Sequence, residues 1–305
     1  MLYLIPVLLG ITLMAFLLGI FSPGDPAQMA LSQGIEEPTE EEIQAKRIEL
    51  GLDKPYHVQY LSWLGRALHG DLGTSYLTQK PVSAELLQRM PHTLSLAFFS
   101  AFIAISLGIP LGLYMAVTKH RGMHNALDTM SVAFISIPGF CTALILIWIF
   151  AEKLRWLPTS GADGFRSFIM PAVALSIPTV GSIARLMKSS VQKELTRQYV
   201  LVAYSKGLRS RTVCFFHAFR NSLIPVVAFL GNFLGGILGG AAVIESIFSI
   251  PGLGSYALKA IGGRDYPALQ GYVMITGFIF VMIHFLVDIV SFGLNPQIQL
   301  EGEKK

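Results

Sequence analysis

The chain has 305 residues, of which 52% are hydrophobic and only 14% are charged, with a mean hydropathy of +0.56 and a formal net charge of +4. A soluble domain carries about 25% charged residues, so this sequence has too few polar residues to cover a surface that faces water. The composition therefore excludes an ordinary soluble protein. It predicts an all-α protein that crosses a membrane several times.

Six apolar runs are long enough to cross a bilayer, because a spanning helix needs about 20 mostly apolar residues and pairs its backbone groups internally. These runs are residues 2–21, 92–117, 127–151, 168–187, 223–245 and 271–293. The fourth run contains Pro171, Pro178 and Gly181, which membrane helices tolerate where neighbouring helices satisfy the freed backbone groups. We therefore expect a kinked fourth helix that faces the protein interior.

The first run has an alternative interpretation as a cleavable signal peptide. The charged segment that opens such a signal is missing, however, and the apolar stretch is long for one. We therefore expect residues 1–22 to form the first transmembrane helix.

The basic residues of the loops indicate the orientation, because cytoplasmic loops of membrane proteins are enriched in lysine and arginine. Segment 185–222 carries eight basic residues against one acidic residue, Glu194. Residues 23–91, in contrast, contain ten acidic and six basic residues. These counts place 185–222 in the cytoplasm and 23–91 outside it. Six spans then leave both termini in the cytoplasm.

The acidic external segment is expected to fold into a small helical domain. In "PTEEEIQAKRIELG", Thr39 is an N-cap, Glu42 completes a capping box, and Gly51 follows the end of the helix. The stretch "PYHVQYLSWLGRALHG" predicts a second helix that ends at Gly70. The apolar residues near one of its faces are Val58, Leu61, Leu64 and Leu68. This domain either packs against the spans, docks a partner or covers a pathway.

The stretch "AYSKGLRSR" and the residues after it place four basic residues around one glycine between two apolar runs. They are Lys206, Arg209, Arg211 and Arg220. Residues 189–201 can form a helix that leaves the membrane, and residues 212–219 are apolar again. Glycine adopts positive φ without steric cost, so we expect a sharp turn at Gly207 between two helices. The basic residues either fix the topology or bind a soluble partner, and charge alone does not separate these interpretations.

The order of residues in "YVLVAYSKGLRSRTVCFFHAFRNSLIPV" is more specific. It resembles the cytoplasmic EAA loop of permease subunits of binding-protein-dependent ABC importers, in the branch for dipeptides, oligopeptides and nickel. The matching positions are Tyr199, Val200, Ala203, Lys206, Gly207, Leu208, His217, Ala218, Asn221 and Pro225. Residues 22–27, 50–76 and 245–271 also resemble stretches of this branch. The resemblance thus covers four motifs in the same order over nearly the whole chain.

The resemblance implies the fold of a type I ABC importer permease with six transmembrane helices. Its parts are the first transmembrane helix (1–22), the external helical segment (23–91), a five-helix core (92–293) with a cytoplasmic coupling loop (188–222), and a cytoplasmic tail (294–305). In this family the loop forms a coupling helix that docks on an ATPase. The residues implied in coupling are Ala203, Tyr204, Ser205, Lys206, Gly207, Leu208 and Arg209.

The stretch "ESIFSIPGLG" resembles the external gate region of the family. The resemblance implies gate roles for Glu245, Pro251 and Gly252. The alternative for Glu245 is that it caps the turn at Pro251 and Gly252.

Ionisable residues inside spans are candidates for function by default. Three acidic residues near span ends qualify, namely Asp128, Glu245 and Asp288, and we expect Asp288 to face a neighbouring helix. The glycine-rich run 231–240 predicts close contact between helices. By the resemblance, the seam with a partner permease lies there.

The resemblance also implies the partners and the location. The expected partners are a second homologous permease, two ATP-binding-cassette ATPases, an extracytoplasmic solute-binding protein and the lipid bilayer, with no nucleic acid and no cofactor. The expected location is the cytoplasmic membrane of a prokaryote. The two permeases would form the path for peptides, or for nickel or a metal chelate, delivered by the binding protein.

Patterns of catalytic residues are absent from the sequence. No G-x-x-x-x-G-K-[ST] loop is present, so ATP hydrolysis is expected on the partners. No G-x-S-x-G and no H-E-x-x-H occurs either, and neither a catalytic nor a metal site is expected. A channel or secondary transporter that works alone is the alternative function, but the sequence shows no inverted repeats for it.

Overall fold

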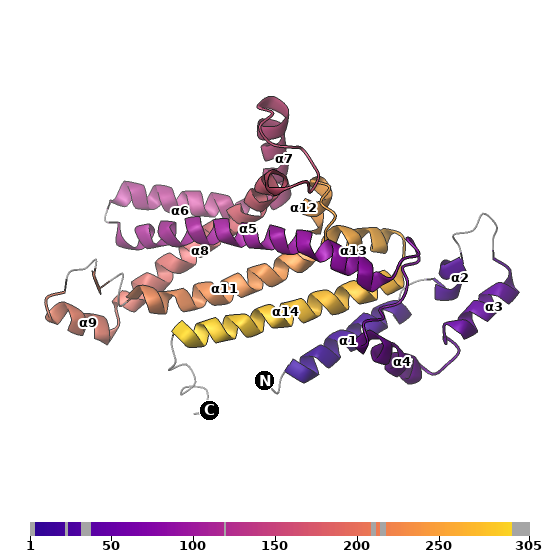
Figure 1. Ribbon diagram of the computed structural model, residues 1–305. Coiled ribbons are helices and arrows are strands. Elements are labelled where there is room, and N and C mark those ends of the chain that lie inside the picture. Colours follow the sequence, from indigo (N-terminus) through magenta and orange to yellow (C-terminus); the bar gives the residue numbers. More distant parts are fainter. Residues whose placement is uncertain are drawn as a thin grey trace. The chain divides into compact units, whose positions relative to one another are not determined.

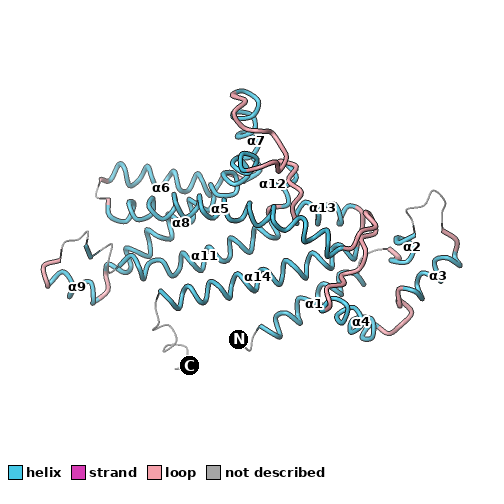
Figure 2. Tube along the Cα trace, in the orientation of Figure 1, coloured by secondary structure: helices cyan, strands magenta, loops and turns pink. Residues whose placement is uncertain are grey.

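The computed structural model describes residues 4–21, 24–31, 38–118, 120–208, 212–213 and 218–294. The described residues form helices and one isolated bridge between Thr74 and Pro81 (Figures 1 and 2), which confirms the all-α fold class. The helices are α1 (Leu4–Phe21), α2 (Pro26–Leu31), α3 (Glu40–Glu49), α4 (Tyr56–Leu68), α5 (Val82–Val117), α6 (Arg121–Ser136), α7 (Gly139–Leu146), the π-helix η1 (Ile147–Lys153), α8 (Phe165–Leu195), α9 (Gln198–Ser205), α11 (Phe219–Gly240), α12 (Ala242–Ile247), α13 (Leu253–Gly262) and α14 (Tyr266–Leu294).

The chain divides into two compact units. Unit 1 consists of Met1–Thr93 and Pro251–Val281, and unit 2 consists of Leu94–Ile250 and Met282–Lys305. Helices α5 and α14 continue from one unit into the other. The second predicted span was expected from residue 92, whereas α5 already begins at Val82.

Four helices are long and apolar enough to cross a membrane, namely α5, α8, α11 and α14. A fifth candidate is the pair formed by α6 with α7 and η1. The first apolar run forms α1, whose 18 described residues measure about 27 Å along the axis, slightly less than the hydrocarbon thickness of a bilayer. The six predicted runs therefore correspond to four long helices, one bent pair and one shorter apolar helix.

The third run was expected to be one span over residues 127–151, but it is not one continuous helix. Helix α6 ends at Ser136, and the segment Gly139–Lys153 leaves it at an angle of 95°. Pro138 lacks a backbone N–H and forces the residue before it out of the helical region, and Ile137 accordingly has φ −81° and ψ 119°. Figure 1 shows α7 turning away from the direction of α6.

Helix α8 is the central element of unit 2. It continues from Phe165 to Leu195 through both Pro171 and Pro178, and fourteen of its 31 residues are buried. Helices α6, α7 and α11 pack against it. The expectation that this helix faces the interior is confirmed.

Glycine residues allow neighbouring helices to approach α8 closely. A Cβ atom on Gly112 of α5 would lie 2.7 Å from Cβ of Met187 and would also overlap the carbonyl oxygen of Ala184. A Cβ atom on Gly181 of α8 would lie 2.6 Å from the carbonyl oxygen of Ser131 on α6. Small residues at such positions are typical of helix contacts in membranes, where van der Waals packing supplies much of the association energy.

The capping box predicted for α3 is present in unit 1. The N–H of Glu42 donates to the hydroxyl of Thr39 at 3.3 Å, and the N–H of Thr39 donates to the Glu42 carboxylate at 2.8 Å. These hydrogen bonds from Thr39 lower the pKa of Glu42 below its usual value. Gly51 follows the helix with φ +68°, as the sequence predicted.

The apolar face expected for α4 is only partly buried. Val58, Leu61 and Leu68 are exposed, whereas Trp63 is buried. Trp63 and Tyr60 pack around Phe16 of α1, with ring centroids 6.0 Å and 5.4 Å from it. Aromatic rings bury more apolar surface than leucine, so they decide which side of α4 packs inward.

Replacing Gly112 with valine should destabilise the protein, because the added carbons overlap α8. Overpacking of this kind costs about 1–3 kcal/mol. The measurement is the thermal unfolding midpoint of the purified chain in detergent. The matched control is Gly10→Val in α1, where an added Cβ meets no atom within 4 Å. An equal midpoint for both variants would contradict the close packing of α5 on α8.

Candidate functional site

The predicted coupling loop begins where α8 leaves the core of unit 2. Helix α8 ends at Leu195, and α9 begins three residues later. The side chains of Val200, Ala203 and Val213 are buried and pack together with Leu195. This apolar cluster holds α9 against the end of α8. Much of the helix predicted over 212–219 lies outside the described residues.

Gly207 ends α9 in a backbone conformation that other residues rarely adopt. Its φ is +78°, and the N–H of Leu208 donates to the carbonyl oxygen of Ala203 at 3.3 Å. This bond is typical of the Schellman motif, in which glycine takes the left-handed position after a helix. The sharp turn predicted at Gly207 is therefore confirmed. Arg209 and the side chain of Tyr204, two further predicted coupling residues, lie outside the described part of the chain.

The outer side of α9 exposes apolar and polar side chains together. Leu201 and Val202 are 58% and 54% exposed, and Leu208 is 37% exposed. The predicted coupling residues Ser205 and Lys206 are exposed beside them. An exposed apolar surface rimmed by polar residues is typical of a protein interaction site.

Tyr199 connects the end of α8 with the start of α11. Its hydroxyl donates to Oε2 of Glu194 at 2.7 Å and accepts from Nδ2 of Asn221 at 3.3 Å. Partial burial, together with the hydrogen bond to Glu194, raises the pKa of Tyr199 above its usual value. Tyr199 and Asn221 match the EAA pattern. The sequence analysis did not predict the role of Glu194. A contact between residues on either side of a turn leaves no periodic signal in a sequence.

The predicted gate residues fall on both sides of the boundary between the units. Glu245 lies in α12 of unit 2 and is fully buried, and its backbone carbonyl accepts from the N–H of Ile250 at 2.8 Å. Pro251 and Gly252 belong to unit 1, where Pro251 is exposed. The buried Gly252 is the N-cap of α13, and its N–H donates to the hydroxyl of Ser255 at 3.1 Å.

A buried carboxylate in unit 1 was missed by the sequence analysis. Asp265 is 1% exposed and accepts hydrogen bonds from the hydroxyl of Ser75 and from the N–H groups of Leu77 and Ala268, the last two at 3.2 Å and 3.3 Å. The bond from Ala268 makes Asp265 a cap at the start of α14. The sequence signal was an aspartate two residues before a proline at the beginning of an apolar run.

A second cluster of charged side chains in unit 1 lies at the start of α5. The carboxylate of Glu85 is mostly buried, accepts from the hydroxyl of Thr78 at 3.0 Å and pairs with Arg89 at 3.4 Å. The guanidinium of Arg89 lies 4.7 Å from the ring centroid of Tyr256 in α13. The contacts of Glu85 and Arg89 join α5 to α13. Burial, together with the nearby Glu85 carboxylate, raises the pKa of Tyr256. Burial also raises the pKa of Tyr76 to about 12.

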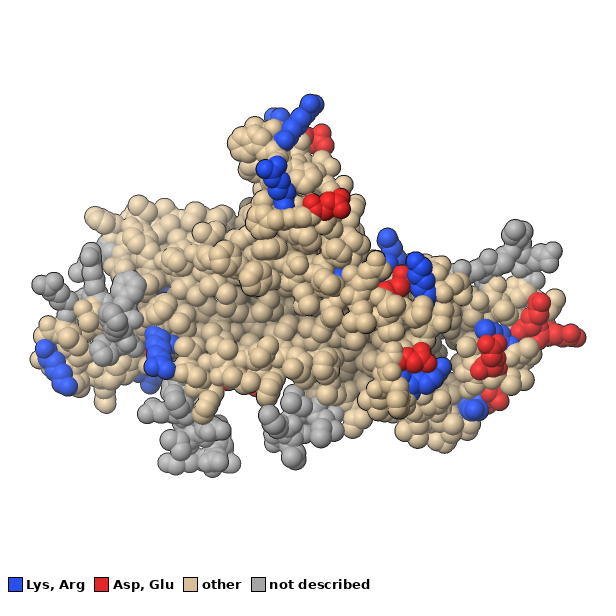
Figure 3. Space-filling model, viewed as in Figure 1, with Lys and Arg blue, Asp and Glu red and all other residues tan. Residues whose placement is uncertain are grey.

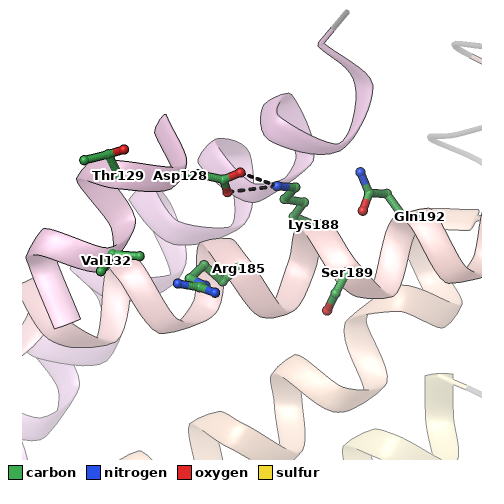
Figure 4. Close-up of a pocket in the computed structure, with 7 residues that line it drawn as sticks. All are labelled: Asp128, Thr129, Val132, Arg185, Lys188, Ser189 and Gln192. Atoms are coloured by element: carbon green, nitrogen blue, oxygen red, sulfur yellow. Dashed lines mark hydrogen bonds and ion pairs between the residues drawn. The ribbon is translucent and has the colours of Figure 1, made fainter. Parts of the chain in front are cut away.

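Asp128, one of the acidic candidates, has a partner that the sequence did not predict. Its carboxylate lies 2.7 Å and 2.8 Å from Nζ of Lys188, so the pair links α6 to α8 (Figure 4). His124 approaches the same carboxylate at 3.3 Å. The described part of the chain contains no group of three or more His, Cys, Asp or Glu side chains that could hold a metal ion.

Polar side chains also occur on the membrane-crossing part of unit 2. Asp288 is exposed on α14, so no helix among the described residues covers it, contrary to expectation. One helical turn before it, Nε2 of His284 lies 3.2 Å from Oδ1 of Asn232 on α11. In the glycine-rich run, a Cβ on Gly231 would lie 2.6 Å from Val287, whereas Gly236 faces open space. Close helix contact is thus confirmed at Gly231 but not at Gly236.

Replacing Tyr199 with phenylalanine should loosen α9, because the variant loses the hydroxyl that binds Glu194 and Asn221. A hydrogen bond contributes about 1 kcal/mol, so amide hydrogen exchange of α9 should become about fivefold faster, as measured by mass spectrometry. The control is Tyr114→Phe on the exposed side of α5, which should leave α9 unchanged. Unchanged exchange in the Tyr199 variant would show that the hydroxyl does not hold α9.

Comparison with known proteins identifies the family. Residues 108–299 match the binding-protein-dependent transport system inner membrane component, and residues 1–97 match the N-terminal domain of the same membrane components. A peptide transport system permease of Brucella abortus (strain 2308) is 36% identical over 305 residues, which cover 97% of this chain and 96% of the relative. The glutathione transport system permease protein GsiC of Salmonella choleraesuis (strain SC-B67) is also 36% identical, with the same coverage of both chains.

A solved structure agrees with this assignment at the level of the fold. An inward-facing conformation of the MetNI methionine ABC transporter aligns with a TM-score of 0.60 and 16% identity, over 69% of this chain and 96% of that chain. The two sequence matches together cover nearly all of the 305 residues. The chain therefore belongs to the family of binding-protein-dependent transport system inner membrane components.

Proposed function

We propose that this chain is a permease subunit of an ATP-driven importer of peptides and that α9 is the element through which an ATPase moves it. The observation that supports this proposal most directly is the exposed apolar side of α9 at the end of α8. Membership of the family implies ATPase and binding-protein partners. The chain itself has no phosphate-binding loop, so ATP is hydrolysed on the partners.

The geometry supports transmission of motion from α9 to α8. The apolar cluster around Val200 and the hydrogen bonds of Tyr199 fix α9 to the end of α8. Helix α8 is in turn buried among its neighbours. A packed core is not continuously deformable, so a displacement of α9 moves α8 with its neighbours as a body. The proposed contact segment for the ATPase is 203–209, with Gly207 setting the direction of the turn. Within it, Ser205, Lys206 and Leu208 are exposed, whereas Ala203 is buried and supports the segment from below.

The distribution of charge supports an orientation with α9 on the cytoplasmic side. Figure 3 shows Lys and Arg residues at the α9 end of unit 2 and an uncharged surface over the middle of α11. Lysine and arginine are enriched in cytoplasmic loops. We place the chain in the cytoplasmic membrane of a prokaryote, with both termini inside and residues 23–91 outside.

The proposed assembly contains this chain, a second homologous permease, two ATPases and an extracytoplasmic binding protein. We assign Glu245, Pro251 and Gly252 to the external gate. We also assign the polar face of α11 and α14, with Asn232 and His284, to the path or its lining, because polar groups in membrane spans mark substrate routes. Peptides are the proposed substrate class, since the relatives include a peptide and a glutathione permease. The comparisons give no support to a channel that works alone.

Replacing Gly207 with valine should reduce uptake without preventing insertion. A β-branched residue at φ +78° costs about 1–2 kcal/mol and disturbs the turn that orients α9, so a loss of about tenfold or more is expected. The measurement is ATP-dependent uptake of a radiolabelled dipeptide by cells that carry the whole transporter. The amount of permease in the membrane is determined by immunoblot.

The matched control is Gly207→Asn, because asparagine tolerates the left-handed conformation. This variant should retain most of the uptake. Normal uptake by the valine variant would refute the coupling role of the turn. Labelled nickel, supplied in parallel, tests the substrate class: uptake of nickel without uptake of dipeptide would refute the peptide assignment.

A further inference from the structure

A pocket of about 530 Å³ lies between α6 and α8, near the end of α8 that leads to α9. Its lining residues are Asp128, Thr129, Val132, Arg185, Lys188, Ser189 and Gln192 (Figure 4). Six of these seven side chains are polar. Three of them fall at the start of the predicted coupling loop (188–222), but none is among the proposed coupling residues 203–209 or the proposed gate residues. The proposed function therefore gives the pocket no role.

The residues from α8 share one face of the helix. They follow one another at spacings of three, one and three residues, and residues three and four apart lie on the same side of an α-helix. The face therefore presents the guanidinium of Arg185, the ammonium of Lys188 and the side-chain amide of Gln192 in a row. The hydroxyl of Ser189 lies beside them but donates to the carbonyl oxygen of Leu186 at 2.9 Å. Thr129 adds a hydroxyl from α6.

The charge of the pocket is not balanced within it. Lys188 is paired with Asp128, and its side chain is only 16% exposed. Arg185 is exposed, and no carboxylate lies within ion-pair distance of it among the described residues. The pocket thus contains two cations and one carboxylate, which leaves a net charge of +1. Arginine presents a planar set of donors that fits the oxygens of a phosphate.

The depth of Arg185 along α8 fits the surface of a bilayer. Arg185 follows Phe165 by 20 residues, a distance of about 30 Å along the helix axis. This distance equals the hydrocarbon thickness of a typical bilayer. The fourth apolar run, 168–187, ends within one helical turn of Arg185, so in the proposed orientation Arg185 lies near the headgroups of the cytoplasmic leaflet. Lys188, Ser189 and Gln192 then extend into the headgroup layer.

We propose that this pocket binds the phosphate of an anionic lipid headgroup from the cytoplasmic leaflet. The guanidinium of Arg185 is the principal contact, and Lys188, which stays paired with Asp128, is the second cation. Basic pockets between transmembrane helices on the cytoplasmic side commonly hold anionic headgroups. The proposal rests on the orientation given under the proposed function, but it requires no transport.

The test measures lipid retained by the full chain after purification with its partner subunits. The protein is exchanged into mixed detergent micelles with phosphatidylglycerol or phosphatidylethanolamine, and bound lipid is counted by native mass spectrometry. The Arg185→Gln variant should bind phosphatidylglycerol about fivefold more weakly, the effect of one basic residue near an anionic membrane surface. The control Lys193→Gln removes the same charge from an exposed position of α8 outside the pocket and should bind as the unaltered protein does.

A second variant separates loss of the site from loss of the fold. Asp128→Asn removes the carboxylate that compensates Lys188, so it should increase phosphatidylglycerol retention, whereas damage to the fold would reduce it. Equal weakening in Arg185→Gln and Lys193→Gln, or retention lost in Asp128→Asn, would overturn the proposal. So would displacement of the lipid by millimolar inorganic phosphate, since that result would indicate a site for a free anion.

The experiment also distinguishes this proposal from the proposed function. Lipid retention is measured without ATP, substrate or binding protein. If the Gly207→Val variant transports normally, the coupling role is refuted. The lipid site still stands in that case, provided that the unaltered protein retains phosphatidylglycerol. A pocket that holds lipid in the isolated chain but not in the assembled transporter would be covered by the second permease, and the lipid proposal would be wrong.

Discussion

The close packing of helices on α8 is the contact on which unit 2 depends. A bilayer supplies no hydrophobic force between apolar helices, so the helices must gain their association energy from van der Waals contact and interhelical hydrogen bonds. Gly108, Gly112 and Gly181 provide that contact, because each lies where a side chain would overlap a neighbouring helix. The two prolines of α8 are tolerated in the same surroundings, since both lie on a helix that is covered on several sides.

This packing connects the helical core of unit 2 to α9 through α8. Its 31 residues measure about 46 Å, which exceeds the hydrocarbon thickness, so its last turns project beyond the apolar layer. At that end, α8 carries the ion pair with Asp128 on one side and the hydrogen bond from Tyr199 to Glu194 on another. Polar contacts of this kind are directional. They fix the angle at which α9 leaves the helix more narrowly than apolar contact alone would.

Local features could be predicted from the sequence because their physical cause is local. The capping box of Thr39 and Glu42 and the positive φ of Gly207 depend on residues within one helical turn. The break at Pro138 was missed because apolar periodicity continues through it, and a proline inside a span does not always end the helix. The bond between Ser75 and Asp265 joins residues 190 positions apart, a pairing that no pattern in a single sequence reveals.

The exposure of Asp288 depends on which surfaces of the chain face lipid, water or another protein, and a single sequence does not show this. An ionised carboxylate on a spanning helix costs about 2.5–3.5 kcal/mol at the centre of a bilayer and less toward its surface. Within this chain, Asp288 is exposed on α14, near the exposed Asn232 and the Asn232–His284 contact. A chain that faced lipid on every side would bear these costs without compensation. Water in a pathway or a second polypeptide removes them, so the polar face itself argues that the single chain is one part of a larger assembly.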